Sequence, residues 1–126
     1  MIDAIFNDPN YLAGKKMLDA IALRQEAIAA NIANLETPGY QRVDLSPSFK
    51  SELERACASG NPQQLASLKP ALAPDTKAVP NSRDGNTVNL ESEMMNLNQN
   101  AIAHAVQIQL LTSTLAKIRL AIVGKN

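Results

Sequence analysis

The sequence has few aromatic residues and no tryptophan, which argues against a sheet-based core. Only 3% of its residues are aromatic, although 45% are hydrophobic. The apolar side chains are mainly Ala, Leu, Ile and Met, which pack helix against helix. A sheet core would use more Val, Phe, Tyr and Trp. The composition therefore predicts an all-α protein.

The chain also lacks an excess of either charge, and it has little cysteine. Twelve basic residues balance twelve acidic ones, so the positive field that attracts phosphate backbones is missing and nucleic acid is not an expected partner. A net charge near zero favours self-association. The single Cys57 cannot form an intrachain disulfide, which leaves the compartment undecided. Its simplest role is that of a small apolar residue on a short helix.

The N-terminus does not resemble a secretory signal. The apolar residues 1–6 include Asp3, and the first basic pair, Lys15-Lys16, follows them instead of preceding them. We therefore expect no cleaved signal peptide. The chain contains no run of eighteen or more apolar residues, so we expect no membrane-spanning helix either.

A helical pattern stops abruptly within residues 29–40, which are Ala-Ala-Asn-Ile-Ala-Asn-Leu-Glu-Thr-Pro-Gly-Tyr. Before the stop, apolar residues recur at the spacing that places them on one helix face. These residues are Leu18, Ile21, Ile28, Ile32 and Leu35. Thr37 precedes Pro38 and is therefore disfavoured in the helical region, and Gly39 can supply the positive φ of a type II turn. We expect a helix over residues 11–36 followed directly by this turn.

Two asparagines lie at the end of this helix. Asn31 and Asn34 can hydrogen-bond nearby backbone groups, and Asn tolerates the left-handed conformation at a helix end. A neighbouring face carries small residues such as Ala20 and Ala27, which would let a second helix approach closely. Tyr40 would either pack over the turn or contact another subunit, and both alternatives stay open.

Residues 37–88 would form the turn, a short helix and a Pro-rich excursion. The Ser46-Pro47 pair suits the N-cap and first position of the short helix, and Gly60 suits its end. Residues 59–85 hold four prolines and few large apolar side chains, so they cannot bury enough surface for a core of their own. We expect an ordered excursion at best and a mobile loop otherwise, with at most a short helical turn over 62–68.

The last third of the chain has an apolar repeat that continues for more than four heptads, which is typical of a coiled-coil seam. Its members are Leu90, Met94, Leu97, Ala101, His104, Ile108, Leu111, Leu115, Ile118 and Ile122. Asn89 can cap a helix over residues 89–123, and Glu91 and Glu93 suit the positive end of its dipole. We expect the two long helices to form an antiparallel coiled-coil hairpin within a single domain, residues 1–126.

The long C-terminal helix is uncharged from Met94 to Ala116. A helix without a charged face is usually covered on every side, and one N-terminal helix cannot cover every face. We therefore expect other subunits to cover the rest. His104, the only histidine, is expected to be a hydrogen-bonded packing residue of the seam and not a metal ligand.

The sequence contains no recognisable chemical site. Gly39 and Gly85 suit turns, because no phosphate-binding glycine pattern surrounds them. No combination of nucleophile, base and pocket is evident. We expect no enzyme activity, no catalytic residue, no cofactor, no metal and no small-molecule substrate.

Two stretches resemble a known family. Residues 30–40 closely resemble the Ala-Asn-Ile-Ala-Asn-x-x-Thr-Pro-Gly-Tyr signature near the N-terminus of the axial proteins of the bacterial flagellum, which form its rod and hook. Residues 84–94, Asp-Gly-Asn-Thr-Val-Asn-Leu-Glu-Ser-Glu-Met, are similar to the C-terminal region of proximal-rod subunits. Leu97, Asn100 and the closing Ala121-Ile122 continue this likeness, which covers roughly two-thirds of the chain.

The resemblance implies a structural subunit of the proximal rod that polymerises through its terminal helices and carries torque from motor to hook. It also implies export in unfolded form by the flagellar type III apparatus, without a cleaved signal, to the basal body in the periplasmic space. The implied partners are other rod subunits, the adaptor protein beneath the rod and the export gate. The residues expected to pack between subunits are Leu18, Ile21, Ile28, Ile32, Leu35, Leu97, Ile108, Leu111, Leu115 and Ile118.

Two alternatives remain. A helical binding module, such as a secretion adaptor or chaperone, could hold one partner with the same two helices, but it would be expected to carry a charged solvent face. Another rod or hook subunit of the same family could carry the same Thr-Pro-Gly-Tyr element. Hook-like members have a large β-rich domain between the helices, and the middle of this chain is too short for one.

Overall fold

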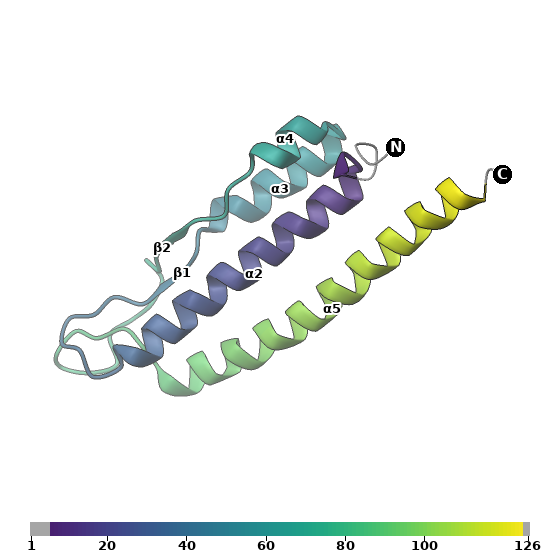
Figure 1. Cartoon of the computed structure of the whole chain (residues 1–126). Helices are drawn as coiled ribbons and strands as arrows, with labels where there is room; N and C mark the ends of the chain where they lie inside the picture. Colours follow the sequence, from purple (N-terminus) through teal and green to yellow (C-terminus); the bar gives the residue numbers. More distant parts are fainter. Residues whose placement is uncertain (1–5, 125–126) are drawn as a thin grey trace.

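The computed structural model describes residues 6–124, and its helices form most of the molecule (Figure 1). The expectation that the apolar N-terminus is not a cleaved signal rests largely on residues 1–5, which lie outside this range. In chain order the elements are α2 (Pro9–Ala33), β1 (Val43–Leu45), α3 (Pro47–Ser59), α4 (Pro62–Ser67), β2 (Leu72–Pro74) and α5 (Leu90–Val123).

Helix α2 begins two residues earlier than expected and ends at Ala33, three residues before the expected limit. Asp8 is its N-cap, and Asp8 Oδ1 accepts a hydrogen bond from the Tyr11 backbone N–H at 3.0 Å. Pro9 can occupy the first helical position because the N–H that it lacks would have no partner there. At the other end the Asn34 N–H bonds the Ala30 carbonyl at 3.1 Å, and the chain then enters the turn.

A two-stranded antiparallel sheet corrects the all-α prediction. Strand β1 pairs with β2 so that Val43 lies opposite Pro74 and Leu45 opposite Leu72. Each strand has only three residues, which is too short for an alternating pattern to stand out in the sequence. The pairing fixes the Pro-rich segment onto the stretch that follows the turn.

The middle segment is ordered and includes a second short helix. Helix α3 starts after Ser46, whose side chain makes no capping bond, and it ends at Gly60 with a φ of 65°. Helix α4 occupies most of the 62–68 stretch, and the Asn61 side chain accepts a hydrogen bond from the Gln63 N–H at its start. Residues 59–85 therefore take the ordered form of the two that were expected.

The hydrophobic core lies between α2 and the α3–α4 pair. Its buried members are Ala20 from α2, Phe49, Leu53 and Ala56 from α3, and Leu65 from α4. Leu65 is fully buried. Small residues on α2 allow α3 and α4 to approach its backbone closely. This face of α2 is thus covered within the chain.

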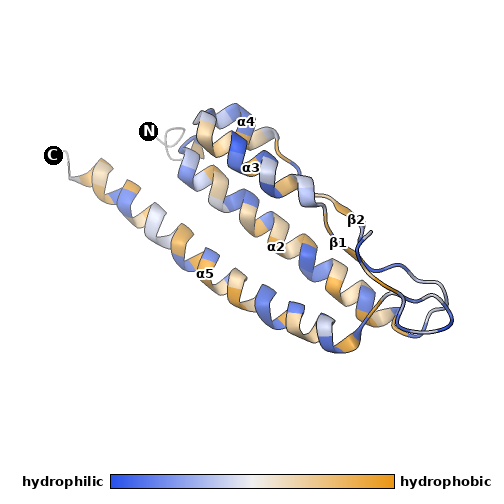
Figure 2. Ribbon diagram, turned by 180° about the vertical axis from the view of Figure 1, so that it is seen from behind, coloured by the Kyte–Doolittle hydropathy of each residue, from blue (hydrophilic) through white to orange (hydrophobic). Residues whose placement is uncertain are grey.

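Helix α5 runs antiparallel along the other side of α2 (Figure 1). Side-chain hydrogen bonds show the direction, because they join Asn31 to Glu93, Ile21 to Asn100 and Gly14 to Gln107. Within the described residues, only Glu93 and Asn100 of α5 are buried, and both are polar. Figure 2 shows hydrophobic residues along the whole of α5.

Candidate functional site

The turn after α2 has the backbone conformation that its sequence requires. Gly39 has a φ of 71°, in the left-handed region where a Cβ atom would be strained. The Tyr40 N–H closes the turn on the Thr37 carbonyl at 3.2 Å, and the Gly39 N–H bonds the Asp84 carbonyl at 2.8 Å. The turn is therefore joined directly to the segment that leads into α5.

Asn86 fastens that segment to the end of α2. Its side-chain NH₂ lies 2.9 Å from the Asn34 carbonyl, 3.0 Å from the Leu35 carbonyl and 2.8 Å from the Thr37 carbonyl. The Asn34 carbonyl belongs to the C-cap of α2, and the Leu35 and Thr37 carbonyls belong to the turn that follows it. Asn86 Oδ1 accepts from the Val88 N–H at 2.8 Å. One buried amide thus closes the end of α2 and orients the start of α5.

Asn31 links three segments from a fully buried position. Its Oδ1 accepts from the Val43 N–H at 2.9 Å and from the Tyr40 hydroxyl at 3.3 Å. Its Nδ2 donates to the Val43 carbonyl at 2.8 Å and to Glu93 Oε2 at 3.3 Å. The side chain therefore bonds β1 as a neighbouring strand would, while it also contacts α5.

Asn34 and Tyr40 act closer to the turn. Asn34 Nδ2 donates to the Ala30 carbonyl at 2.8 Å, and Asn34 Oδ1 accepts from the Thr37 hydroxyl at 3.1 Å. Tyr40 is half-buried and contacts Asn31 within the same chain. Both asparagines thus bond backbone groups near the turn.

Arg42 is the centre of an ionic cluster. Its Nε donates to Glu93 Oε1 at 2.7 Å, and its two terminal nitrogens donate to Asp75 at 2.5 Å and to Asp44 at 3.1 Å. Asp44 also accepts from Arg24 Nε at 3.0 Å. The cluster therefore ties α2, both strand segments and α5 together at one end of the molecule.

Electrostatics favour the charged forms in this cluster. Burial works to lower the pKa of Arg42, but its hydrogen bonds to Glu93 and Asp75 outweigh burial and raise it. Burial works to raise the pKa of Asp44, but the hydrogen bond from Arg24 outweighs it, and that pKa lies below its usual value. The pKa of Asp75 is lowered in the same way, against burial, by the hydrogen bond from Arg42.

The ionic cluster is the feature that sequence reasoning missed. Arg42, Asp44 and Asp75 were not singled out, and Glu93 was expected only to favour the positive end of the α5 dipole. Glu93 is instead fully buried and paired with Arg42. The available signal was its position within the 84–94 motif, but no local pattern connects it to an arginine 51 residues earlier.

Further along α5, polar contacts with α2 continue at wider intervals. Asn100 Nδ2 donates to the Ile21 carbonyl at 3.0 Å and to Gln25 Oε1 at 3.1 Å. Gln107 Nε2 lies 3.4 Å from the Gly14 carbonyl. Gly14 is buried, and a Cβ atom built there would lie 3.1 Å from Leu111 Cδ1. The absence of a side chain at Gly14 is what allows this approach.

The residues expected to pack between subunits differ in burial. Two are buried, Ile21 and Ile28. The half-buried ones are Leu18, Ile32, Leu35, Leu97, Leu111 and Ile118. Ile108 and Leu115 are exposed. The stripe on α5 is therefore only partly covered by α2.

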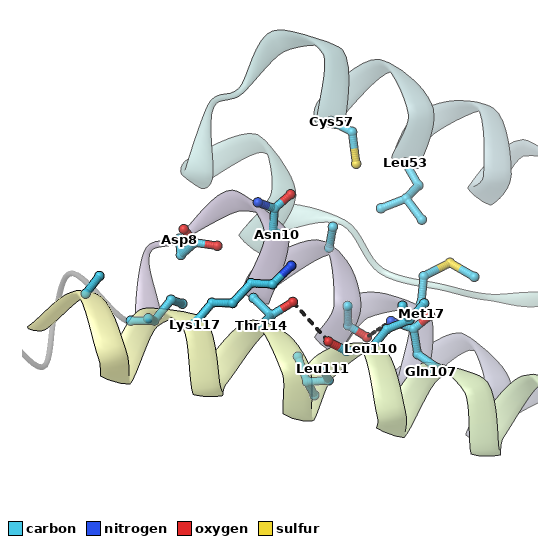
Figure 3. Close-up of a pocket in the computed structure, with 14 residues that line it drawn as sticks. Asp8, Asn10, Met17, Leu53, Cys57, Gln107, Leu110, Leu111, Thr114 and Lys117 are labelled. Carbon is cyan, nitrogen blue, oxygen red and sulfur yellow. Dashed lines mark hydrogen bonds between the residues drawn. The ribbon is translucent and has the colours of Figure 1, made fainter. Parts of the chain in front are cut away.

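One further expectation needs correction. His104 is exposed and not packed in a seam, and it borders a hollow to which α2 contributes Ile21, Ala22 and Gln25. Cys57 lies on the short helix α3 and is exposed. Figure 3 shows Leu53 and Cys57 pointing from α3 toward a cleft between α2, α3 and α5.

Helix α5 is long and apolar enough to cross a membrane by length and composition alone, and its apolar window is not buried in the structure. The sequence expectation of no spanning helix rested on uninterrupted apolar runs, which the amide side chains of α5 break. Among residues 6–124, no group of three His, Cys, Asp or Glu side chains is arranged to hold a metal ion.

Comparisons with known proteins identify the family. Residues 18–41 match the model of the family described as flagella basal body rod protein. The flagellar basal body rod protein FlgB of Salmonella typhimurium is 34% identical over 89% of this chain and 91% of the relative. FlgB of Borrelia hermsii is 34% identical over 72% and 78%, and FlgB of Escherichia coli is 32% identical over 78% and 81%. The chain therefore belongs to the FlgB family of flagellar basal body rod proteins.

Proposed function

We propose that this chain is a proximal-rod subunit that polymerises through its terminal helices and carries torque from motor to hook. The observation that carries the proposal is the surface of α5. The helix is uncharged from Met94 to Ala116, and nearly all of it is exposed or half-buried. Apolar helix surface of this length is stabilised when other helices remove it from water.

The proposed mechanism couples folding to assembly. The Leu and Ile stripe of α5 gains most of its burial from neighbours, so the C-terminal half of α5 becomes stable only when subunits associate. In the assembled rod, α2 and α5 form a coiled-coil seam within a continuous layer of helices. Of the α5 residues expected to pack between subunits, Ile108 and Leu115 have the most surface left to cover.

The position and partners of the chain follow from the same proposal. Neighbouring rod subunits, the adaptor beneath the rod and the export gate are its partners. It acts in the periplasmic part of the basal body and leaves the cytoplasm through the flagellar export apparatus without a cleaved signal peptide. It has no substrate and no enzyme activity.

The alternatives gain less support. A secretion adaptor or chaperone would keep the solvent side of its long helix charged, and 23 successive residues of α5 carry no charge. Another rod subunit of the same family is the closer alternative, but the similarity to FlgB relatives over most of the chain favours the proximal rod.

Deletion of the gene tests the proposal directly. We expect rod assembly to stop at its first step while the export apparatus stays intact, as judged by isolating basal bodies. Complementation with the intact gene is the control. Filaments that still grow in the deletion strain would contradict the rod assignment.

The purified chain tests the coupling of folding to assembly. Limited proteolysis and circular dichroism of the dilute protein should show accessible termini and a melting transition that rises with protein concentration. Protected termini, together with a cooperative melt that is independent of concentration, would contradict coupled folding and assembly.

A further inference from the structure

A cleft opens where the N-terminal half of α2, the C-terminal half of α3 and the C-terminal half of α5 meet (Figure 3). Its volume is about 660 Å³. The apolar side chains that line it include Met17 from α2, Leu53 from α3, and Leu110 and Ile118 from α5. Leu110 is 56% exposed and Met17 is 36% exposed. The cleft therefore offers apolar surface that an occupant would remove from water.

The cleft also holds a cation without a described partner. Figure 3 shows the Lys117 side chain extending from α5 across the cleft toward α2. The ion pairs within residues 6–124 all belong to the ionic cluster at the other end of the molecule, so no described carboxylate pairs with Lys117. The other charged group of the lining, Asp8, caps α2 through its bond from the Tyr11 N–H. An occupant with apolar side chains and one carboxylate would match this cleft.

The five residues that precede the described range have this chemistry. Residues 1–5 are Met-Ile-Asp-Ala-Ile, so they supply apolar side chains and a single carboxylate. The two residues beyond the other end of the range, Lys125 and Asn126, are polar. They would add a second cation beside Lys117 and no apolar side chain. Charge and hydrophobicity therefore favour residues 1–5 as the occupant.

The segment is attached beside the cleft and is long enough to fill it. Residue 5 is three positions before Asp8, which lines the cleft, and three residues span at most about 10 Å. The part of α2 that lines the cleft, residues 8–17, is about 14 Å long at 1.5 Å per residue. Five extended residues reach about 17 Å. Residues 1–5 can therefore lie along the whole of the cleft.

The chain just before α2 already turns back toward that helix. The ring of Phe6 meets the ring of Tyr11 edge to face, with 5.9 Å between the ring centroids. Tyr11 and Gly14 are three residues apart and therefore share a face of α2, and Gly14 lines the cleft. The residue that follows the segment thus contacts α2 next to the cleft.

We infer that residues 1–5 dock in the cleft of their own chain, with Ile2 and Ile5 against its apolar lining and the Asp3 carboxylate beside Lys117. In the folded subunit the segment then covers apolar surface of Met17 and joins α2, α3 and α5. An exposed ion pair contributes little stability, so the segment opens often and stays accessible to proteases. Such docking goes beyond the proposed function, because it takes place within a single subunit.

Cysteine cross-linking tests the docking. Cys57 is the only cysteine of the chain, it is exposed, and it borders the cleft. In an Ile2→Cys variant, mild oxidation should form a disulfide within one chain, seen as a monomer of shifted mobility on a non-reducing gel. The matched control combines Ile2→Cys with Cys57→Ser and Ser51→Cys. Because Ser51 is exposed and lies about 160° around α3 from Leu53, the control should cross-link several-fold more slowly.

Charge reversal tests the pairing of Asp3 with Lys117. In the Ile2→Cys background, Asp3→Lys or Lys117→Glu alone should slow disulfide formation by about twofold to fivefold, the range expected for an exposed ion pair. The two changes together exchange the charges of the pair and should restore the rate. Arg119→Glu removes an exposed cation that lies outside the cleft lining, and it should not restore the rate of Asp3→Lys.

Dilute and concentrated samples are oxidised in parallel, and sedimentation of the same samples measures association. A monomeric disulfide at either concentration supports docking within the chain. A dimeric product alone, equal rates for Cys57 and the Ser51→Cys control, or a double charge reversal that restores nothing would overturn it. Failure to associate at any concentration would count against the proposed function alone. Circular dichroism verifies that each variant keeps the helix content of the parent.

Discussion

The two sides of α2 are covered in opposite ways. On the α3–α4 side, apolar residues such as Phe49 and Leu65 are buried in the core. On the α5 side, Glu93 and Asn100 are the buried residues of α5 among those described, and apolar residues such as Ile108 and Leu115 remain exposed. The first side excludes water by itself. On the α5 side, polar bonds hold α5 against α2, and apolar surface of α5 is left for a neighbouring subunit to cover.

This difference separates folding from assembly within one small chain. A buried Leu or Ile side chain contributes about 1.5–3 kcal/mol when it leaves water, and α5 gains little of this within the monomer. Polar bonds contribute less net energy, but they are directional. The ionic cluster therefore sets the position and alignment of the start of α5. The stability of the rest of α5 depends on other subunits.

Removal of Arg42 should produce the largest effect. Arg42→Ala leaves Glu93 buried without its cation, and the loss of a partner from a buried ion pair costs about 3–5 kcal/mol. Urea unfolding of the dilute protein would measure the loss. Lys15→Ala, which removes an exposed cation from α2, is the control. A loss no larger than the control's would show that the cluster does not hold α5.

Matched leucine truncations test the comparison itself. Leu65→Ala should lower the free energy of unfolding of the dilute protein by about 3 kcal/mol, because it opens a cavity in the core. Leu115→Ala should change it by less than about 0.5 kcal/mol, as expected for a surface position. Thermal unfolding of both variants measures the difference. Equal losses would mean that the two sides of α2 are not distinct.

A side chain at Gly14 should disturb the α5 side alone. The new side chain of Gly14→Leu would press on Leu111 and Gln107. This overpacking should lower the free energy of unfolding by about 1–3 kcal/mol, and the higher helix propensity of Leu should return about 1 kcal/mol of it. Hydrogen exchange should accelerate in the C-terminal half of α5 and stay unchanged in α3. Gly14→Ala, which demands a shift of only tenths of an ångström, is the matched control. Faster exchange in α3 would contradict the prediction.

Acid should have the smallest effect, and it should act on the α5 side. Asp44 and Asp75 have pKa values below their usual range. Their contribution to the free energy of unfolding is therefore complete above about pH 4, and it is lost as the pH falls through their pKa values in the folded state. Melting temperatures should therefore be flat from pH 7 to about 5 and fall below about 4. An Asp44→Asn, Asp75→Asn variant should be less stable at neutral pH and depend less on acid. A parallel decline in parent and variant would refute this assignment.

Local features of the fold could be predicted from the sequence. The positive φ of Gly39, the start of α3 after Ser46 and the Asn89 cap of α5 each depend on a few adjacent residues. The bonds of Asn34 to the Ala30 carbonyl and the Thr37 hydroxyl belong to the same class. These features can be predicted because adjacent residues determine the local conformation, independently of how the rest of the chain folds.

The remaining features depend on residues far apart in the chain. The ionic cluster joins Arg24, Arg42 and Glu93, which share no period or motif. The strand pair depends on which segments meet, and three residues carry too little pattern to reveal it. The heptad repeat of α5 indicated a seam, but a repeat does not tell which partner covers it. His104 shows this limit, since it lies on the repeat and is exposed.

The two antiparallel long helices, α2 and α5, are held together at one end and diverge toward the other. They are held together at the end with Arg42 and Asn86, and they diverge toward the end with the first residue of α2 and the last residue of α5 (Figure 1). A force that parts the two helices loads the bonds in sequence, first Gln107 at 3.4 Å, then Asn100 at 3.0 Å, and last the buried cluster. The contacts between α2 and α5 thus become stronger toward the end with Arg42 and Asn86. The two helices can therefore adjust their spacing at the other end to fit a neighbour without separating.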